Sequence, residues 1–235
     1  MKILFEEWLP DRPSYENQGL IQAKNTIPRA QGYSSLNSLQ TFSGALTGAC
    51  LGAFWLPDLA GTATNFAGDA TKLYKYNNAT TAWADVSIGG GYTSATRWRF
   101  EKFGNRIIAV DIGQNPQYYD LASSSNFADL EGSPPKARYI ATVRDFLVLG
   151  NLTSLPYDVR WSGFNNSALW TASLATQSDS QQLPGRGGAI QALVPGEYGV
   201  IFQENSIWRM DYQGPPTVFR FDEVERGRGT PTPRS

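Results

Sequence analysis

Residues 138–151, RYIATVRDFLVLGN, contain two runs rich in β-branched, aromatic and leucine residues, separated by Arg144 and Asp145. Two such runs with a short break between them are typical of antiparallel strands joined by a turn. Similar stretches occur at 97–111 (RWRFEKFGNRIIAVD) and at 189–203 (AIQALVPGEYGVIFQ). We therefore predict that the chain forms the same kind of hairpin several times.

Each hairpin is followed by two further short segments with the composition of strands. The third segments begin near residues 71, 116, 157 and 206. The fourth segments carry the aromatic residues Trp83, Phe127, Trp170 and Phe219. Both landmarks recur every 41 to 49 residues, and four short strands in a repeat of this length are typical of β-propeller blades. In the third repeat the fourth strand is expected at 169–174 (LWTASL).

The predicted fold class is all-β: a β-propeller-like array of four-stranded blades with an extended amino-terminal arm. A β-sandwich is the alternative, because short strands and turns at regular spacing fit sandwiches as well. The run FLVLG at 146–150 is apolar throughout, as expected for a strand with both faces covered near a central channel. The expected parts are an arm at 1–48, blades at 49–90, 91–132, 133–185 and 186–225, and a tail at 226–235.

The composition excludes several classes of function. The chain has 235 residues, a net charge of −1, no histidine and a single cysteine, Cys50. It therefore lacks the residue types of Cys/His zinc sites, of Ser-His-Asp or Cys-His catalysis and of an intramolecular disulfide. No run of Lys or Arg predicts tight nucleic-acid binding, and we expect no cofactor, no metal and no membrane span. The first residues lack the apolar core of a signal peptide, so synthesis in the cytoplasm is expected.

Residues 1–48 show no repeat and contain three prolines that favour extended backbone. Residues 17–25 can form one short helix. An extended arm with scattered apolar side chains can wrap around a neighbouring subunit or pack over its own propeller, and both alternatives remain open here. The residues that we expect to make subunit contacts are Trp8, Pro10, Asp11, Arg12, Tyr15, Ile27 and Tyr33.

The arm also carries a motif, W-x-P-D-x-P-x-x-x-N-x-G-x-x-x-A-x-N-x-x-P followed by Gly-Tyr. Its residues in this chain are Trp8, Pro10, Asp11, Pro13, Asn17, Gly19, Ala23, Asn25, Pro28, Gly32 and Tyr33. With this motif and its blade segments, the chain resembles a family of structural proteins of short-tailed phages and prophages. Members of that family form the tail hub or nozzle.

The resemblance implies a virion protein that forms a homo-oligomeric ring, with six copies expected, below the portal and the adaptor. DNA would pass along the ring axis without specific binding, and the protein would not be an enzyme. Family members continue beyond the equivalent of residues 225–229, so the way in which the propeller closes is left open.

The alternative function is a carbohydrate-binding or glycan-cleaving propeller used in host attachment. Glycoside hydrolysis needs a pair of carboxylates at a defined separation, and nothing in the sequence brings a particular pair together. Aspartates at blade corners more often form turns. The candidate carboxylates are Asp85, Asp111, Asp120, Asp129, Asp158, Asp211 and Asp222. The glycines at 89–91 are interpreted as a link between the first two blades.

Overall fold

The structure, a computed structural model, describes residues 7–13, 15, 17–30, 32–38, 40–57 and 63–232. The chain divides into two compact units, Met1–Phe42 and Ser43–Ser235. Residues 43–48, which we assigned to the arm, belong to the second unit. Their place there has a physical basis, because Trp83 Nε1 donates to Ser43 Oγ at 2.8 Å and Thr47 Oγ1 donates to Asp69 Oδ2 at 3.0 Å.

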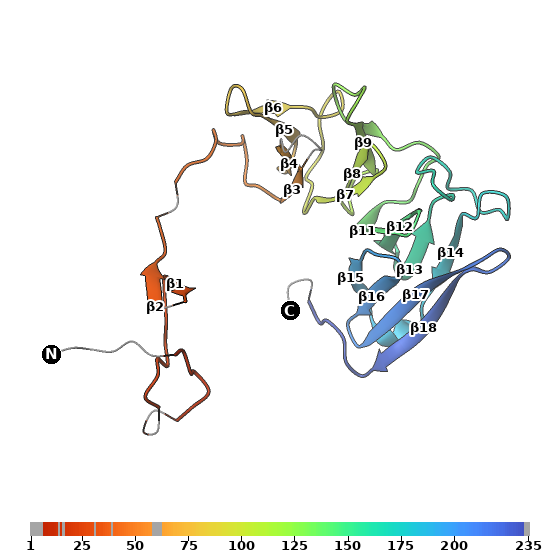
Figure 1. The fold of residues 1–235 in the computed structure, drawn as a ribbon. Helices are drawn as coiled ribbons and strands as arrows, with labels where there is room; N and C mark the ends of the chain where they lie inside the picture. Colours follow the sequence, from red (N-terminus) through yellow and green to blue (C-terminus); the bar gives the residue numbers. More distant parts are fainter. Residues whose placement is uncertain are drawn as a thin grey trace. The chain divides into compact units, whose positions relative to one another are not determined.

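The first unit contains one antiparallel hairpin, β1 (Thr26–Arg29) and β2 (Gly32–Ser35), drawn in orange in Figure 1. The short helix that we expected within 17–25 is absent. Asn17 instead uses its side chain to hold a loop, donating to the carbonyl of Leu9 at 2.6 Å and accepting from Gly19 N at 2.8 Å. Such local side-chain hydrogen bonds compete with helix formation.

The second unit contains four four-stranded antiparallel sheets, each a meander in chain order. The first sheet contains β3 (Gly52–Pro57), β4 (Ala63–Gly68), β5 (Leu73–Asn77) and β6 (Ala82–Asp85). The second contains β7 (Arg99–Phe103), β8 (Arg106–Val110), β9 (Gln117–Asp120) and β10 (Ala128–Asp129). The third contains β11 (Ala137–Val143), β12 (Phe146–Leu152), β13 (Leu155–Trp161) and β14 (Asp179–Gln182). The fourth contains β15 (Ile190–Val194), β16 (Gly199–Gln203), β17 (Ser206–Gly214) and β18 (Val218–Arg226).

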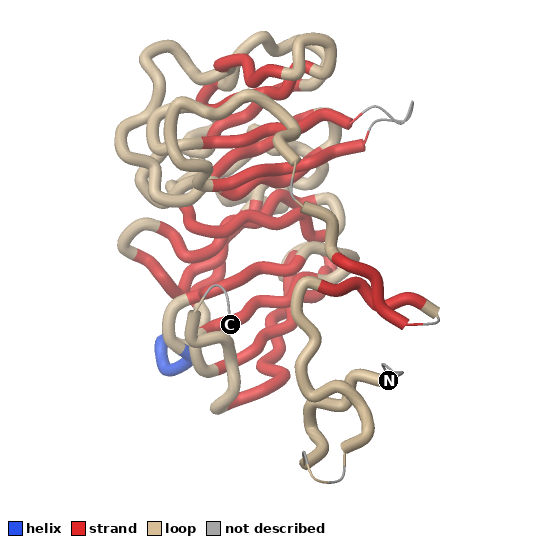
Figure 2. Tube along the Cα trace, turned by 90° about the vertical axis from the view of Figure 1, so that its left-hand side faces the viewer, coloured by secondary structure: helices blue, strands red, loops and turns tan. Residues whose placement is uncertain are grey.

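The sheets follow one another along an arc in chain order, with the first strand of each sheet on the inside (Figure 1). Seen from the side, the strands run across the unit with the loops at their ends (Figure 2). The fold is therefore a propeller-like array of four-stranded blades, as predicted, and not a two-sheet sandwich. The first three sheets lie inside the ranges 49–90, 91–132 and 133–185, and the fourth sheet ends at Arg226, one residue beyond the range 186–225. The only helical segment among the described residues is a 3₁₀ turn, Gly185–Gly187.

The prediction of the fourth strand in the third blade was wrong. The segment 169–174 is a loop, and β14 takes the edge position by pairing with β13. Trp170 explains the error, because its side chain is only 1% exposed and fills the core between the second and third sheets. Its Nε1 donates to the carbonyl of Ser167 at 2.7 Å, and its carbonyl accepts from Arg160.

The second strand of each interior sheet is buried on both faces. In β8, Ile107 faces the first sheet and Ile108 faces the third, and each lies in a separate apolar cluster. All seven residues of β12 are buried. Leu149 packs toward the second sheet and Val148 toward the fourth. A strand covered on both faces is apolar at consecutive positions, which explains the pattern of FLVLG.

Hydrogen bonds also connect the inner strands of neighbouring sheets. Trp98 N donates to the carbonyl of Leu51 at 3.2 Å, from the second sheet to the first. Thr142 N donates to Glu101 Oε1 at 3.1 Å, from the third to the second. Arg144 N donates to the carbonyl of Gly196 at 2.8 Å, from the third to the fourth. These bonds hold the inner edges together along the arc.

We predict that Leu149→Ala lowers the free energy of unfolding by about 2–5 kcal/mol, because it leaves a cavity between two sheets that cannot collapse. The matched change Leu174→Ala, at a side chain that is 66% exposed, should alter it by less than about 0.5 kcal/mol. Urea denaturation of both variants measures the difference. Equal effects would contradict the packing described for β12.

Candidate functional site

The amino-terminal arm is built around a closed loop between residues 7 and 20. Leu9 N donates to the carbonyl of Leu20 at 2.9 Å, and Leu20 N donates to the carbonyl of Glu7 at 2.8 Å. Gly19 allows this close approach, since a Cβ at its position would lie 2.4 Å from the Glu7 carbonyl oxygen. Asn17 closes the loop from the other side. The structure thus explains why Asn17 and Gly19 occur in the sequence motif, since both keep this loop closed.

The hairpin β1–β2 follows this loop, and four residues of the motif gather beside it. A small pocket of about 210 Å³ is lined by Trp8, Ala23, Thr26, Pro28 and Tyr33. All but Thr26 belong to the motif. In the sequence these residues form a pattern only, whereas the structure brings them to one place.

The predicted contact residues of the arm are placed as follows. Trp8 is 57% exposed and Tyr15 is 82% exposed. Pro10, Asp11 and Arg12 are exposed, and Ile27 and Tyr33 are half-buried. Trp8 and Tyr33 line the same pocket, and Ile27 pairs with Ser34 across the hairpin. The structure does not bring the seven residues together into one cluster.

None of the described residues from 7 to 42 is buried. A two-stranded hairpin is marginally stable by itself, and ordering a chain segment costs about 1–2 kcal/mol per residue in backbone entropy. The arm therefore gains stability when its exposed apolar side chains pack against another surface.

The fourth sheet has a face that no other sheet within the described residues covers, and sequence reasoning missed it. Ile201 and Trp208, which pair in register, point toward the third sheet and are buried. The neighbouring pair Phe202 and Ile207 points the opposite way and is only half-buried. Val194, on the same face, is 44% exposed. The segments YGVIFQ (198–203) and FLVLGN (146–151) have similar apolar runs. The strand in FLVLGN is covered on both faces, whereas the strand in YGVIFQ is covered on one face only, and the sequence does not distinguish the two cases.

The outer strands of this face carry ion pairs. Arg209 Nε lies 2.8 Å from Asp211 Oδ2, and Arg220 Nη2 lies 2.9 Å from Asp222 Oδ1. An apolar centre beside a charged border is the usual composition of a protein–protein interface. We refer to Ala192, Val194, Val200, Phe202 and Ile207 together as the open face of the fourth sheet.

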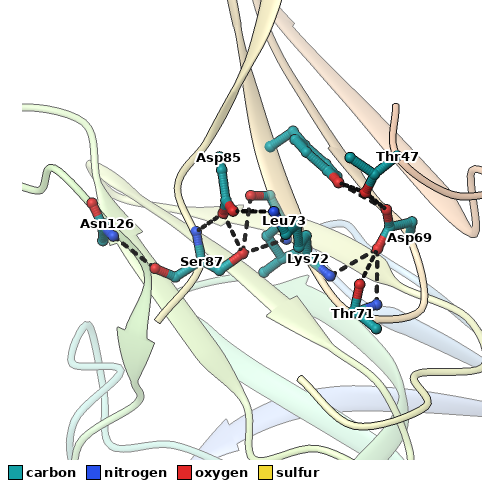
Figure 3. Close-up of polar contacts among 9 residues, drawn as sticks. Thr47, Asp69, Thr71, Lys72, Leu73, Asp85, Ser87 and Asn126 are labelled. Carbon is teal, nitrogen blue, oxygen red and sulfur yellow. Dashed lines mark hydrogen bonds and ion pairs between the residues drawn. The ribbon is translucent and has the colours of Figure 1, made fainter. Parts of the chain in front are cut away.

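The carboxylate of Asp69, which follows β4, is the centre of a polar network in the first sheet (Figure 3). Thr71 N and Lys72 N each donate to its Oδ1 at 2.8 Å, and the Tyr74 hydroxyl donates to its Oδ2 at 2.8 Å. Burial acts to raise the pKa of Asp69, but these bonds and one from Thr47 outweigh it and lower the pKa to about 2. The group is an ionised structural anchor.

Asp111 has the same place after the second strand of the second sheet. Its Oδ2 accepts from Thr96 N at 2.9 Å and from Arg97 N at 2.8 Å, and its Oδ1 accepts from Gly113 N at 2.9 Å. Gln203, at the end of β16, donates to the carbonyl of Gly188 at 2.8 Å. These buried polar groups lie at the end of the second strand in their blades. Each holds the segment that enters the same blade, so the position has a structural use.

A polar pocket of about 590 Å³ lies where the first blade meets the second. It is lined by Thr71, Lys72, Asp85, Ser87, Ile88, the glycines 89–91, Tyr92 and Asn126. Asp85 Oδ2 lies 2.9 Å from Lys72 Nζ, and Ser87 Oγ donates to Asp85 Oδ1 at 2.6 Å. Burial raises the pKa of Asp85, but Ser87 and Lys72 reverse this and hold the pKa below its ordinary value. An ionised carboxylate of this kind cannot serve as a general acid.

The other candidate carboxylates are mostly engaged in local contacts. Asp120 accepts from Ala122 N and Asp129 accepts from Gln117, while Asp211 and Asp222 pair with arginines. Asp158 differs, because its Oδ1 is buried without a hydrogen-bond partner and burial raises its pKa.

The described residues hold neither a metal cluster nor a membrane-spanning helix. Among them, no group of three or more His, Cys, Asp or Glu could bind a metal ion. No helix in the described part of the chain is long and apolar enough to cross a membrane.

Comparisons with known proteins identify no family for the chain. No family model matches it, and no curated protein matches it. Among solved structures it is similar to BamB from Moraxella catarrhalis, with 11% sequence identity and a TM-score of 0.40. The similarity covers 73% of this chain and 48% of that one. At this level the likeness carries no argument about function.

We predict that Asp69→Ala lowers the free energy of unfolding by about 3 kcal/mol, because the hydrogen-bond donors that now bind this charged acceptor would lose their partner. The lowered pKa makes the contribution of Asp69 complete above its ordinary value of 3.8 and lost as the pH falls toward about 2. Denaturation curves of the parent and variant should therefore converge in acid. A difference that persists unchanged down to that pH would contradict the role of the charge.

Proposed function

We propose that this chain is a structural protein of a phage virion that forms part of the tail tube, as a hub or nozzle ring below the portal and the adaptor. In this proposal about six copies assemble into the ring, DNA passes along its axis during ejection, and the protein works by assembly without catalysis. The number of copies and the neighbouring proteins follow from the resemblance of the arm and blades to short-tailed phage proteins.

The arm is the observation that carries the proposal. It has local order from the loop at 7–20 and from the hairpin, yet none of its described residues is buried. Trp8 and Tyr15 present large apolar surfaces to solvent. A segment with this character is suited to bury its side chains against a neighbouring subunit.

The open face of the fourth sheet is a second observation in favour of assembly, as a surface on which the arm of another copy can pack. Three successive pairs of sheets in this chain pack face to face through apolar clusters. The open face presents similar residues, including Phe202 and Ile207, without a covering sheet. The arm and the open face are two different surfaces, so contacts between them would be heterologous. Heterologous contacts form a closed ring when the rotation from one subunit to the next closes on itself.

The carbohydrate-binding alternative has less support. Stacking on successive sugar rings requires several aromatic side chains on one surface. The exposed Trp55 lies on the first sheet and the exposed Tyr198 lies beside the fourth. The carboxylate of Asp85, in the polar pocket between the first two blades, is already paired with Lys72.

The proposal is tested by comparing the full chain with a version that contains residues 43–235 only. We expect the full chain to form rings, detected by native mass spectrometry and cryo-electron microscopy. The shorter chain should remain monomeric with the same unfolding midpoint, because it retains the whole second unit. Trp8→Ala combined with Tyr15→Ala should weaken assembly, whereas Leu174→Ala on the third blade should not.

Cryo-electron microscopy of purified phage particles from the source provides the decisive control. Density for this chain in a ring beneath the portal would support the proposal. A monomeric full chain that is absent from particles and binds host polysaccharide would refute it in favour of the carbohydrate-binding alternative.

A further inference from the structure

Two arginines at the start of the second sheet and a third from the next sheet lie on the inside of the arc. Arg97 lies two residues before the start of β7, Arg99 begins this strand, and Arg138 lies in β11. These two strands are the innermost of the second and third sheets and lie side by side (Figure 1). The absence of a basic run in the sequence therefore does not mean the absence of a basic cluster in the fold.

The alternation of side chains separates these arginines from the core. Trp98 and Phe100 pack into the cluster between the first and second sheets. Because successive side chains of an extended segment point to opposite sides, Arg97 and Arg99 lie on the other side, toward the third sheet. The guanidinium of Arg99 is 4.4 Å from the centroid of the Tyr139 ring, next to Arg138 in the chain.

No carboxylate forms an ion pair with the cluster within the described part of the chain. None of the three arginines is in an ion pair there. The Nε atom of Arg99 is buried and has no hydrogen-bond partner. The nearby carboxylates are used elsewhere, since Glu101 accepts from Thr142 N and Asp111 accepts from backbone N–H groups.

The electrostatic state of Arg99 agrees with this geometry. Burial lowers the pKa of its guanidinium, Tyr139 acts to raise this pKa, and the charges of Arg97 and Arg138 lower it. A bound anion would relieve both the repulsion and the unsatisfied donor.

We infer that Arg97, Arg99 and Arg138 form a binding site for a phosphate group on the inner edge of the second and third blades. The planar guanidinium matches the oxygens of phosphate and can bind two of them at once. Two sources share this chemistry, the DNA backbone and free phosphate. The assignment to DNA rests on the proposed function, whereas the site itself does not.

The test uses the full chain with a short fluorescein-labelled DNA duplex at low salt, followed by fluorescence anisotropy. We expect Arg97→Gln/Arg99→Gln/Arg138→Gln to weaken binding by about tenfold or more, as for the loss of a charge-assisted hydrogen bond. The slope of log affinity against log salt should become shallower by about 0.9 for each phosphate that the variant no longer neutralises. Inorganic phosphate should compete with the duplex.

The matched control is Arg186→Gln/Arg220→Gln/Arg226→Gln, which removes the same charge from ion-paired arginines near and on the fourth sheet. It should bind the duplex like the parent. The single change Arg138→Gln, at an exposed residue, should reduce binding while leaving the unfolding midpoint unchanged, so that a folding defect in the triple variant does not decide the result.

The outcomes separate the site from the proposed function. Equal losses in both triple variants, or no binding of duplex or phosphate by the parent, would overturn the inference. Binding of inorganic phosphate that depends on these arginines, without binding of DNA, would keep the site and reject the DNA source. Ring assembly is measured separately, so assembly without arginine-dependent binding would reject only the site.

Discussion

The fold depends on the burial of each interior second strand between two neighbouring sheets. A four-stranded sheet in water exposes apolar residues on both faces, and only another sheet on each side covers them. Ile107 and Ile108, adjacent in β8, belong to different apolar clusters for this reason. The same requirement buries β12 at every position, whereas Phe202 and Ile207 on the open face of the fourth sheet are half-buried.

This packing also decides what lies on the inside of the arc. The first strand of each sheet is its inner edge, and hydrogen bonds such as Thr142 N to Glu101 connect these edges. Residues about 40 positions apart, Arg99 and Arg138, are thereby brought to neighbouring strands. The inner edge therefore carries a group of arginines that the net charge of −1 does not suggest.

The polar residues serve mainly to hold the blades in shape. Asp69 and Asp111 occupy corresponding places after second strands, and each accepts hydrogen bonds from the backbone of a turn or of an entering segment. These two carboxylates therefore have a structural use. The arm differs from the blades, because it has local order but no buried residue among those described, and it exposes Trp8 and Tyr15.

The all-β class, the four blades and the position of most hairpins could be read from the amino-acid order, because alternation and turn residues act within a few positions of the chain. The same reasoning misplaced the last strand of the third blade, since Trp170 has the composition of a strand residue but fills a core between sheets. It also suggested a short helix where Asn17 holds a loop. Which faces stay open and which arginines meet emerged with the packed fold alone, because both depend on how separate sheets pack and not on neighbours in the chain.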